Sequence, residues 1–208
     1  KAQFNTDRLL MVGQSALYYE DYVLSIQYFN QVISAKPYLY EPWFYRGLAK
    51  FYLDDYQGAE NDCTEALDRN PFVVSVYELR GLCRIRQDNF AGAVKDYDKA
   101  LKYDPENRNL WHNRVLCHIQ QKEYDVALAQ IDTMLTRWSK NAKVYAMQAE
   151  VYMLQKDTTK AVVALDKSIA IDPYDGSLWS QKAIISMARH QWKESDEYLS
   201  KAIHLMPK

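Results

Sequence analysis

The chain has 208 residues, 48% of them apolar, and its 26 lysines and arginines almost balance its 27 aspartates and glutamates to give a net charge of −1. Binding to nucleic acid or to an anionic membrane usually requires a basic surplus, so this balance argues against both kinds of partner. Membrane insertion is not expected either, because no apolar run approaches the roughly 20 residues that span a bilayer.

Prolines recur along the chain with a spacing of 34 residues, at Pro37, Pro71, Pro105, Pro173 and Pro207, and Ser139 takes the one remaining place. A fixed period of this length is typical of a stack of similar units. Aligned on this period, the chain divides into six rows, which cover residues 6–39, 40–73, 74–107, 108–141, 142–175 and 176–208. We expect the rows to form a single array over residues 1–208.

Each row has the pattern of two helices. Apolar residues recur at intervals of three and four, which is the period of an amphipathic helix. A short polar break divides the row, and the proline after its second half stops the second helix. In four rows the middle residue of the break is an Asp or Asn that can cap the second helix: Asp21, Asp55, Asn89 and Asp157. The sequence therefore predicts an all-α fold of about twelve antiparallel helices.

Large and small residues alternate between two columns of the aligned rows. The large column holds Trp43, Trp111 and Trp179, and the small column, four residues later, holds Gly47 and Gly81. A glycine inside a helix costs about 1 kcal/mol relative to alanine, so its repeated use needs a packing reason. We attribute the glycines to close contact between helices, and the tryptophans to filling the space between successive units.

The second row carries the pattern Trp43-x-x-Arg46-Gly47-x-x-Lys50, followed by Ala59, Cys63, Ala66-Leu67 and Pro71. This pattern, repeated in register from Thr6 to Pro207, resembles the tetratricopeptide repeat family. The resemblance implies antiparallel helix pairs stacked into a right-handed alpha-alpha superhelix, a solenoid with a concave groove. The chain departs from the family at the turn between the two helices, where the family favours Gly and this chain has Glu20, Asp54, Asp88, Lys122, Lys156 and His190.

Three arginines occupy a column in which the family favours Leu: Arg46, Arg80 and Arg114. An unpaired charge on a packed helix face is costly. We therefore expect Arg46 to pair with Asp62, Arg80 to pair with Asp62 or Asp96, and Arg114 to pair with Asp96 of the preceding unit. The alternative is that the guanidinium groups reach solvent along their aliphatic stems. Either role is structural.

Catalysis is not expected from the side chains present. The histidines lack the i, i+4 pair of a helical metal site, and His118 falls on a packed column. No glycine-rich phosphate loop or recognisable nucleophile motif occurs, so we predict no enzyme activity, no cofactor and no metal. The cysteines, which form no Cys-x-x-Cys pair, are expected to be small buried apolar residues: Cys63, Cys83 and Cys117.

The resemblance implies that one face of each first helix lines the concave groove. The residues of that face that we single out as a candidate peptide site are Phe44, Tyr45, Leu48, Phe51, Tyr52, Glu78, Arg86, His112, Asn113, Lys143 and Glu150. An aromatic patch beside polar groups suits an extended or helical peptide. The alternative is ordinary partial exposure of single surface residues.

One subtype of the family is disfavoured. Some members hold the acidic C-terminus of heat-shock chaperones with a Lys and Asn clamp, and the corresponding positions here are Leu10 and Gln14, Phe44 and Leu48, or Glu78 and Leu82. We therefore predict a non-catalytic scaffold that binds some other protein or peptide. The sequence indicates a bacterial protein, located in the cytoplasm or, after removal of a signal peptide, in the periplasm or cell envelope.

The apolar residues of the segment from Trp192 to Met206 suggest two alternatives to this function. A solenoid end needs a polar outer face, so either further repeats follow in a longer protein or a second copy covers this end. The second case would make the chain a self-associating structural module, possibly of the cell envelope. A sensor or regulatory fragment of a larger protein is the remaining possibility.

Overall fold

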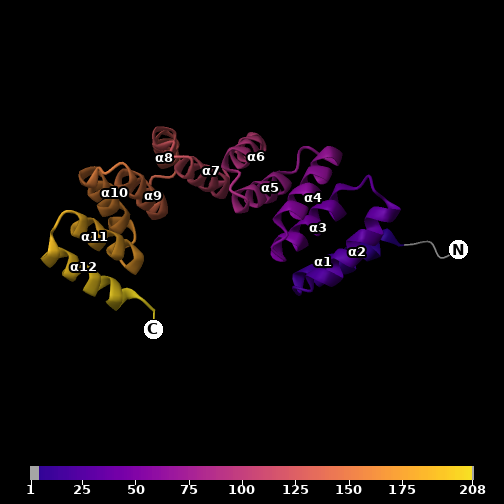
Figure 1. The fold of residues 1–208 in the computed structure, drawn as a ribbon, viewed down its shortest axis with the longest axis horizontal. Helices are drawn as coiled ribbons and strands as arrows, with labels where there is room; N and C mark the ends of the chain where they lie inside the picture. Colours follow the sequence, from indigo (N-terminus) through magenta and orange to yellow (C-terminus); the bar gives the residue numbers. More distant parts are fainter. Residues whose placement is uncertain (1–4, 208) are drawn as a thin grey trace. The chain divides into compact units, whose positions relative to one another are not determined.

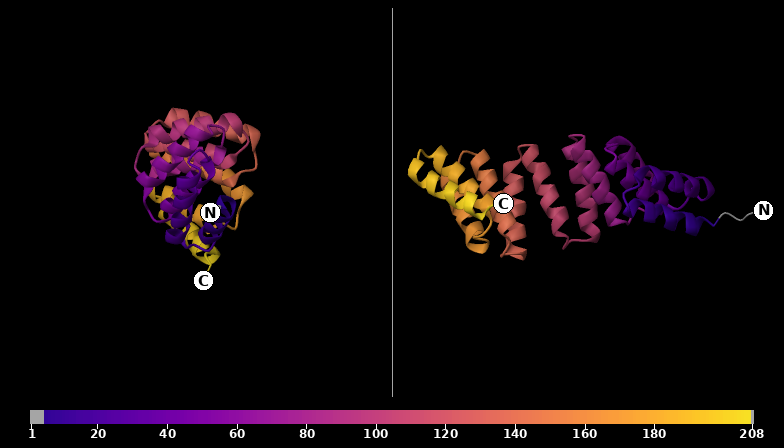
Figure 2. Two further views of the ribbon diagram at one scale, coloured as in Figure 1. Left: turned by 90° about the vertical axis from the view of Figure 1, so that its right-hand side faces the viewer. Right: turned by 90° about the horizontal axis from the view of Figure 1, so that it is seen from below.

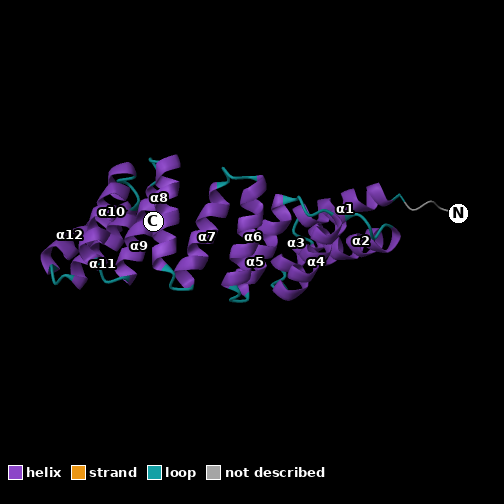
Figure 3. Ribbon diagram, turned by 90° about the horizontal axis from the view of Figure 1, so that it is seen from above, coloured by secondary structure: helices purple, strands orange, loops and turns teal. Residues whose placement is uncertain are grey.

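The computed structural model describes residues 5–207, and all regular structure within that range is α-helical (Figure 1, Figure 3). The helices are α1 (Thr6–Tyr18), α2 (Tyr22–Ala35), α3 (Tyr40–Tyr52), α4 (Tyr56–Arg69), α5 (Val74–Arg86), α6 (Phe90–Tyr103), α7 (Arg108–Gln120), α8 (Tyr124–Arg137), α9 (Ala142–Leu154), α10 (Thr158–Ile171), α11 (Gly176–Ala188) and α12 (Trp192–Leu205). The predicted all-α fold of about twelve helices is confirmed.

The chain forms two compact units, and the boundary between Cys117 and His118 lies inside α7. In the first unit, the pairs α1–α2, α3–α4 and α5–α6 are hairpins, and α2 packs on α3 as α4 packs on α5. In the second unit, α9–α10 and α11–α12 are hairpins, α8 packs on α9 and α10 packs on α11. Figure 2 shows the hairpins of each unit following one another in chain order. The assignment of all six rows to one array stays a prediction.

The 34-residue rows fix where the helices begin and end. Every odd-numbered helix starts at the first residue of its row and has 13 residues. Every even-numbered helix has 14 residues and ends two residues before the proline or, in the fourth row, before Ser139. The proline therefore lies just beyond the helix, where its missing N–H costs no helical hydrogen bond.

The large aromatic residues have a polar role that the sequence did not suggest. The indole nitrogens of Trp43, Trp111 and Trp179 donate hydrogen bonds to the carbonyl oxygens of the prolines six residues earlier, at 3.1, 2.8 and 2.8 Å. The Tyr77 hydroxyl donates to the Pro71 carbonyl oxygen at 2.7 Å. Each bond ties the start of a first helix to the end of the preceding second helix. The proline and the aromatic residue together therefore fix the connection between successive hairpins.

These aromatic residues pack against the core but are not its deepest members. Trp43 and Trp111 are half-buried against the core of the first unit, and Trp179 is half-buried against that of the second. The neighbouring column, one residue earlier, is buried in five rows: Pro42, Val76, Leu110, Val144 and Leu178. Within each unit, the aromatic rings therefore cover the seam between successive hairpins, while this smaller apolar column fills the seam.

The turns between paired helices are built from left-handed residues and helix caps. The six residues that replace the family glycine all have φ between 58° and 64°. Side chains of Asp21, Asp55, Asn89 and Asp157 accept hydrogen bonds from the backbone N–H three residues later, at 3.2, 2.9, 3.0 and 3.1 Å. The four predicted caps are confirmed, and each offsets part of the cost of a left-handed residue without glycine.

The glycine column makes room for the residue 16 positions later, on the second helix of the same hairpin. A Cβ at Gly13 would lie 2.6 Å from the Phe29 ring, and a Cβ at Gly81 would lie 2.8 Å from the Tyr97 ring. At Gly47 the opposing residue is small, and a Cβ would lie 3.2 Å from Asp62 and 3.3 Å from the Ala59 carbonyl oxygen. Close backbone approach therefore explains Gly47, whereas the other two glycines accommodate rings.

We expect Gly81→Leu to lower the free energy of unfolding by about 1–3 kcal/mol or more, because the fully buried Tyr97 ring cannot move aside. The double variant Gly81→Ala, Tyr97→Leu recreates the pair that the fifth row holds at Ala149 and Leu165. It should cost less than the sum of its two single variants in urea unfolding. A melting temperature of Gly81→Leu within about a degree of wild type would refute the packing argument.

Two buried aspartates hold four basic residues of α3 and α5. Asp62 accepts from Arg46 Nε and Nη2 at 2.9 and 2.8 Å, and its other neighbour is Lys50 Nζ at 3.1 Å. Asp96 accepts from Arg80 Nη2 at 2.7 Å and from Arg84 Nη1 at 3.0 Å. The predicted Arg46–Asp62 pair is confirmed, and Arg80 takes Asp96, the second of its two predicted partners.

The predicted pairing of Arg114 with Asp96 is wrong. Arg114 Nη1 instead contacts Asp98 Oδ1 at 2.9 Å, on the second helix of the preceding hairpin. Asp96 is already saturated by Arg80 and Arg84, which surround a carboxylate that is 1% exposed. In the second unit Lys182, in the same column as Arg114, likewise reaches back 16 residues to Asp166, at 2.8 Å.

The two aspartates of α6 should differ sharply when removed. Asp96→Ala leaves two half-buried guanidinium groups without their acceptor, and we expect a loss of about 3 kcal/mol or more in the free energy of unfolding. Asp98→Ala removes a carboxylate that is 51% exposed, and should cost less than about 1 kcal/mol. Equal losses in chemical denaturation would show that Asp96 is not the anchor of this network.

Candidate functional site

The surface of the first unit is hollowed between α1, α2 and α3. The hollow has a volume of about 510 Å³ and is called the tyrosine hollow below. It is lined by Gln14, Leu17, Tyr18, Glu20, Tyr22, Tyr45, Leu48 and Tyr52. Tyr45, Leu48 and Tyr52 are three of the candidate groove residues, so the structure brings this part of the predicted face together.

The rings around the tyrosine hollow support one another. Tyr22 and Tyr52 stack with ring centroids 5.1 Å apart and planes 20° from parallel. Tyr45 stacks on the buried Phe29 at 5.8 Å. Tyr18 is 81% exposed and Tyr52 is 53% exposed, so packing leaves much of both rings free. The hollow therefore combines supported tyrosine walls with open ring surface.

Two candidate groove residues serve the core instead. Phe44 and Phe51 are half-buried and pack against the core of the first unit. Each also supports a wall residue, because Phe44 lies 5.3 Å from Tyr45 and Phe51 lies 5.9 Å from Tyr52 between ring centroids. They therefore support the two tyrosines from the side of the core.

Two lining residues lie outside the first helices, whose face was the predicted groove. Tyr22 is the first residue of α2, and Glu20 is the left-handed residue of the turn before it, with φ 64°. Desolvation, and then the nearby Glu20 and Tyr52, raise the pKa of Tyr22 above its ordinary value, so its hydroxyl stays neutral at physiological pH. The one sequence signal for this part of the hollow was an aromatic residue, Tyr22, at the start of a predicted second helix.

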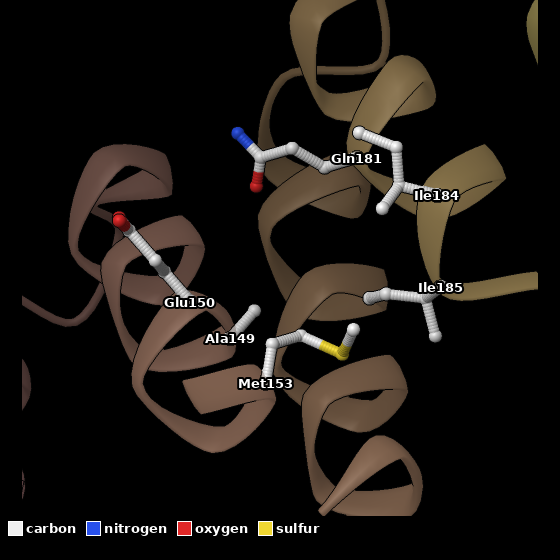
Figure 4. Close-up of a pocket in the computed structure, with 6 residues that line it drawn as sticks. All are labelled: Ala149, Glu150, Met153, Gln181, Ile184 and Ile185. Atoms are coloured by element: carbon white, nitrogen blue, oxygen red, sulfur yellow. The ribbon is translucent and has the colours of Figure 1, made fainter. Parts of the chain in front are cut away.

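A second hollow lies on the second unit between α9 and α11, with a volume of about 370 Å³. Figure 4 shows its lining, in which Glu150 and Gln181 supply the polar groups while Met153 and two isoleucines supply apolar surface. The full set is Ala149, Glu150, Met153, Gln181, Ile184 and Ile185. Glu150 is thus the one candidate groove residue that lines this aliphatic hollow.

The two hollows occupy equivalent positions four repeats apart. Gln14 and Leu17 align with Glu150 and Met153, and Tyr45 and Leu48 align with Gln181 and Ile184. The hairpin geometry therefore produces the hollow, and the residues at these columns decide its chemistry. In the first unit that chemistry is aromatic, and in the second it is aliphatic.

The remaining polar candidates lie outside both linings. Arg86 is exposed, with its guanidinium 5.8 Å from the centre of the Tyr56 ring, and His112 and Asn113 are half-buried in α7. Glu78 is half-buried, and desolvation followed by the charge of Asp104 raises its pKa. Lys143 is exposed on α9. Their proposed contact with a ligand stays a prediction.

The cysteines and His118 lie in the packed interior. The cysteines are buried thiols, as predicted, and burial raises the pKa of Cys117 to about 11. A hydrogen bond with Cys83, followed by burial, raises the pKa of Cys63 as well. His118 is 9% exposed, as expected of a packed histidine, and its Nδ1 lies 3.1 Å from Glu123 Oε2.

Within residues 5–207, no group of three or more His, Cys, Asp or Glu side chains is placed to hold a metal ion. None of the helices described in the structure has the length and apolar character needed to cross a membrane.

The repeated hairpins and their equivalent hollows define an α-helical repeat protein. A family model for the tetratricopeptide repeat matches residues 44–108, 84–142 and 118–176, which together span more than half of the chain. The chain therefore belongs to the tetratricopeptide repeat family, whose fold is generally a non-enzymatic scaffold for protein interactions. The resemblance found in the sequence is confirmed.

Solved structures agree with this assignment. A tetratricopeptide repeat protein from Parabacteroides merdae has 16% sequence identity, a TM-score of 0.70, and coverage of 100% of this chain and 81% of its own. The C-terminal part of a repeat protein from Cytophaga hutchinsonii has 15% identity, a TM-score of 0.80, and coverage of 94% and 78%.

A third structure, the first tetratricopeptide domain of Spaghetti (RPAP3), was solved with the HSP90 peptide SRMEEVD. It has 24% identity, a TM-score of 0.54, and covers 56% of this chain and 95% of its own. At these identities the likeness establishes the tetratricopeptide solenoid fold and nothing finer. No curated protein sequence matches the chain.

Proposed function

We propose that this protein is a non-catalytic scaffold that binds a segment of a partner protein in the hollows along its first helices. The observation that carries the proposal is the recurrence of a hollow at equivalent positions in both units. Side chains that helix packing leaves open line these hollows, with Tyr52 53% exposed and Ile184 54% exposed. Supported rings and aliphatic side chains around a few polar groups suit a peptide.

The peptide-bound relative supports this class of function, because its ligand is a short linear segment. The ligand chemistry is different here. The positions that hold the basic clamp in chaperone-tail binders carry Leu10, Gln14 and Leu48 among others. Gln14 and Leu48 line the tyrosine hollow, which therefore lacks the cations that an acidic tail requires.

The proposal is tested by capturing partners from a lysate with the intact chain and with Tyr52→Ala, followed by mass spectrometry. The matched control is Tyr38→Ala, which removes a tyrosine that is 68% exposed and lies in a loop outside both hollows. We expect Tyr52→Ala to lose proteins that Tyr38→Ala retains. An identical set from all three chains would move the binding surface away from the tyrosine hollow.

Self-association through the last hairpin is a second candidate function. In α4, α6 and α10, the equivalent residues Leu67, Leu101 and Ile169 are 7–8% exposed, beneath the helix that follows. Ile203 occupies the same column in α12 and is 69% exposed. This face of α12 is therefore apolar, like the faces that are buried in the other hairpins. We propose that a second copy of the chain packs against it.

Sedimentation across a concentration series tests this candidate. We expect the wild-type chain to dimerise with rising concentration, and Ile203→Lys to stay monomeric. Val163→Lys, at an apolar residue of α10 that is 54% exposed, is the matched control and should dimerise like wild type. A wild-type chain that remains monomeric at millimolar concentration would end the self-association reading.

A further inference from the structure

The tyrosine hollow has a chemical bias that goes beyond peptide binding in general. Among its lining residues Glu20 is the only charged one, and it is acidic. Glu20 is exposed, and within the described chain its carboxylate has no hydrogen-bond or ion-pair partner. The hollow thus joins four tyrosine rings to one uncompensated negative charge.

Several large aromatic rings elsewhere already hold a cation from the chain itself. Trp43 has the guanidinium of Arg69 4.4 Å from its ring centroid, and Trp111 has that of Arg114 at 4.5 Å. Trp179 has the ammonium of Lys201 at 4.1 Å. Weaker contacts of the same kind are made by Tyr56, Tyr77, Tyr145 and Tyr152. Cation–π contact therefore recurs in several repeats of this protein.

The four tyrosines of the hollow differ from these rings. Over residues 5–207, Tyr18, Tyr22, Tyr45 and Tyr52 have no lysine or arginine over their rings. The basic residues of α3 are engaged elsewhere, because Arg46 and Lys50 both bind Asp62. No cation from within the described chain competes for this site.

We propose that the tyrosine hollow binds a lysine or arginine side chain of the partner segment. The inference rests on the proposed function and names its ligand chemistry. The ring faces attract the cation through their quadrupoles, and Glu20 adds a charge on the same side. Leu17 and Leu48 accept the aliphatic stem of the side chain, as apolar surface does for buried lysines and arginines. The volume of about 510 Å³ is in the range of small-ligand sites.

The test uses the intact chain with ¹³C-labelled tyrosine rings and three capped heptapeptides that differ only in a central arginine, leucine or glutamate. We expect the arginine peptide to shift the ring signals of Tyr22 and Tyr52 and to leave Tyr38 unchanged. The leucine peptide should bind at least fivefold more weakly, and the glutamate peptide more weakly still. Raising the salt concentration should weaken the arginine peptide alone.

Three variants separate the ring and charge contributions. Glu20→Gln, at an exposed turn position, should weaken the arginine peptide by about threefold to fivefold without changing the leucine peptide. Tyr52→Ala should weaken it by about fivefold or more, and Tyr52→Phe, which keeps the ring face, should bind as wild type does. Thermal melts of each variant confirm that the first unit remains folded.

The possible outcomes distinguish this inference from the proposed function. Equal binding of the arginine and leucine peptides, or insensitivity to Glu20→Gln, overturns the cation site while leaving a peptide hollow in place. No response to the arginine peptide at about 5 mM also overturns it, because a specific contact should be detectable there. If Tyr52→Ala captures the same lysate proteins as the wild-type chain, the tyrosine hollow is removed from the proposed function as well.

Discussion

The structure depends on one constraint, which is that the first helices α3, α5, α9 and α11 must each pack against two second helices at once. Midway along a hairpin, a residue of the first helix faces the residue 16 positions later in its own hairpin and the one 16 positions earlier in the preceding hairpin. Arg46 shows both contacts, with Asp62 on one side and Asn30 Oδ1 at 2.9 Å on the other. Side-chain size is matched across the same spacing of 16 residues. Gly81, which follows Arg80, leaves room for the ring of Tyr97. Volume and charge are therefore matched pairwise across three helices, and this fixes the register of the stack.

The same constraint allows the compensating acid to lie on either side. For Arg80 it is the buried Asp96 within the hairpin, and Thr64 of the preceding hairpin supplies only a hydroxyl. For Arg114 the acid is Asp98 of the preceding hairpin. The first arrangement stiffens a hairpin, whereas the second ties two hairpins together through a more exposed and more strongly screened pair. The repeats are thus equivalent in shape but differ in what their charges hold together.

Much of the fold could be read from the sequence because the signals were local. The row starts, the four helix caps and the Arg46–Asp62 pair all follow from spacing within one repeat. The partner of Arg114 could not be read this way. Asp96 and Asp98 are two residues apart on one helix, and spacing does not reveal that Asp96 is already occupied by two other cations. Nor does a helical pattern show that Trp43 would donate to a proline carbonyl, because that bond crosses from one repeat to the next.

The candidate site was predictable only as a face. The family resemblance placed Tyr45, Leu48 and Tyr52 on it, but it placed Phe44 and Phe51 there as well, and these two pack against the core. What separates them is which rings remain open once α1, α2 and α3 are packed, and that depends on contacts between repeats. The open rings also differ in whether an arginine or lysine of the chain itself lies over them. A ring that already carries such a cation stabilises the folded state, and a guest would have to displace that cation first. A ring without one requires no such displacement, and for this reason the cation site is proposed at the tyrosines of the hollow.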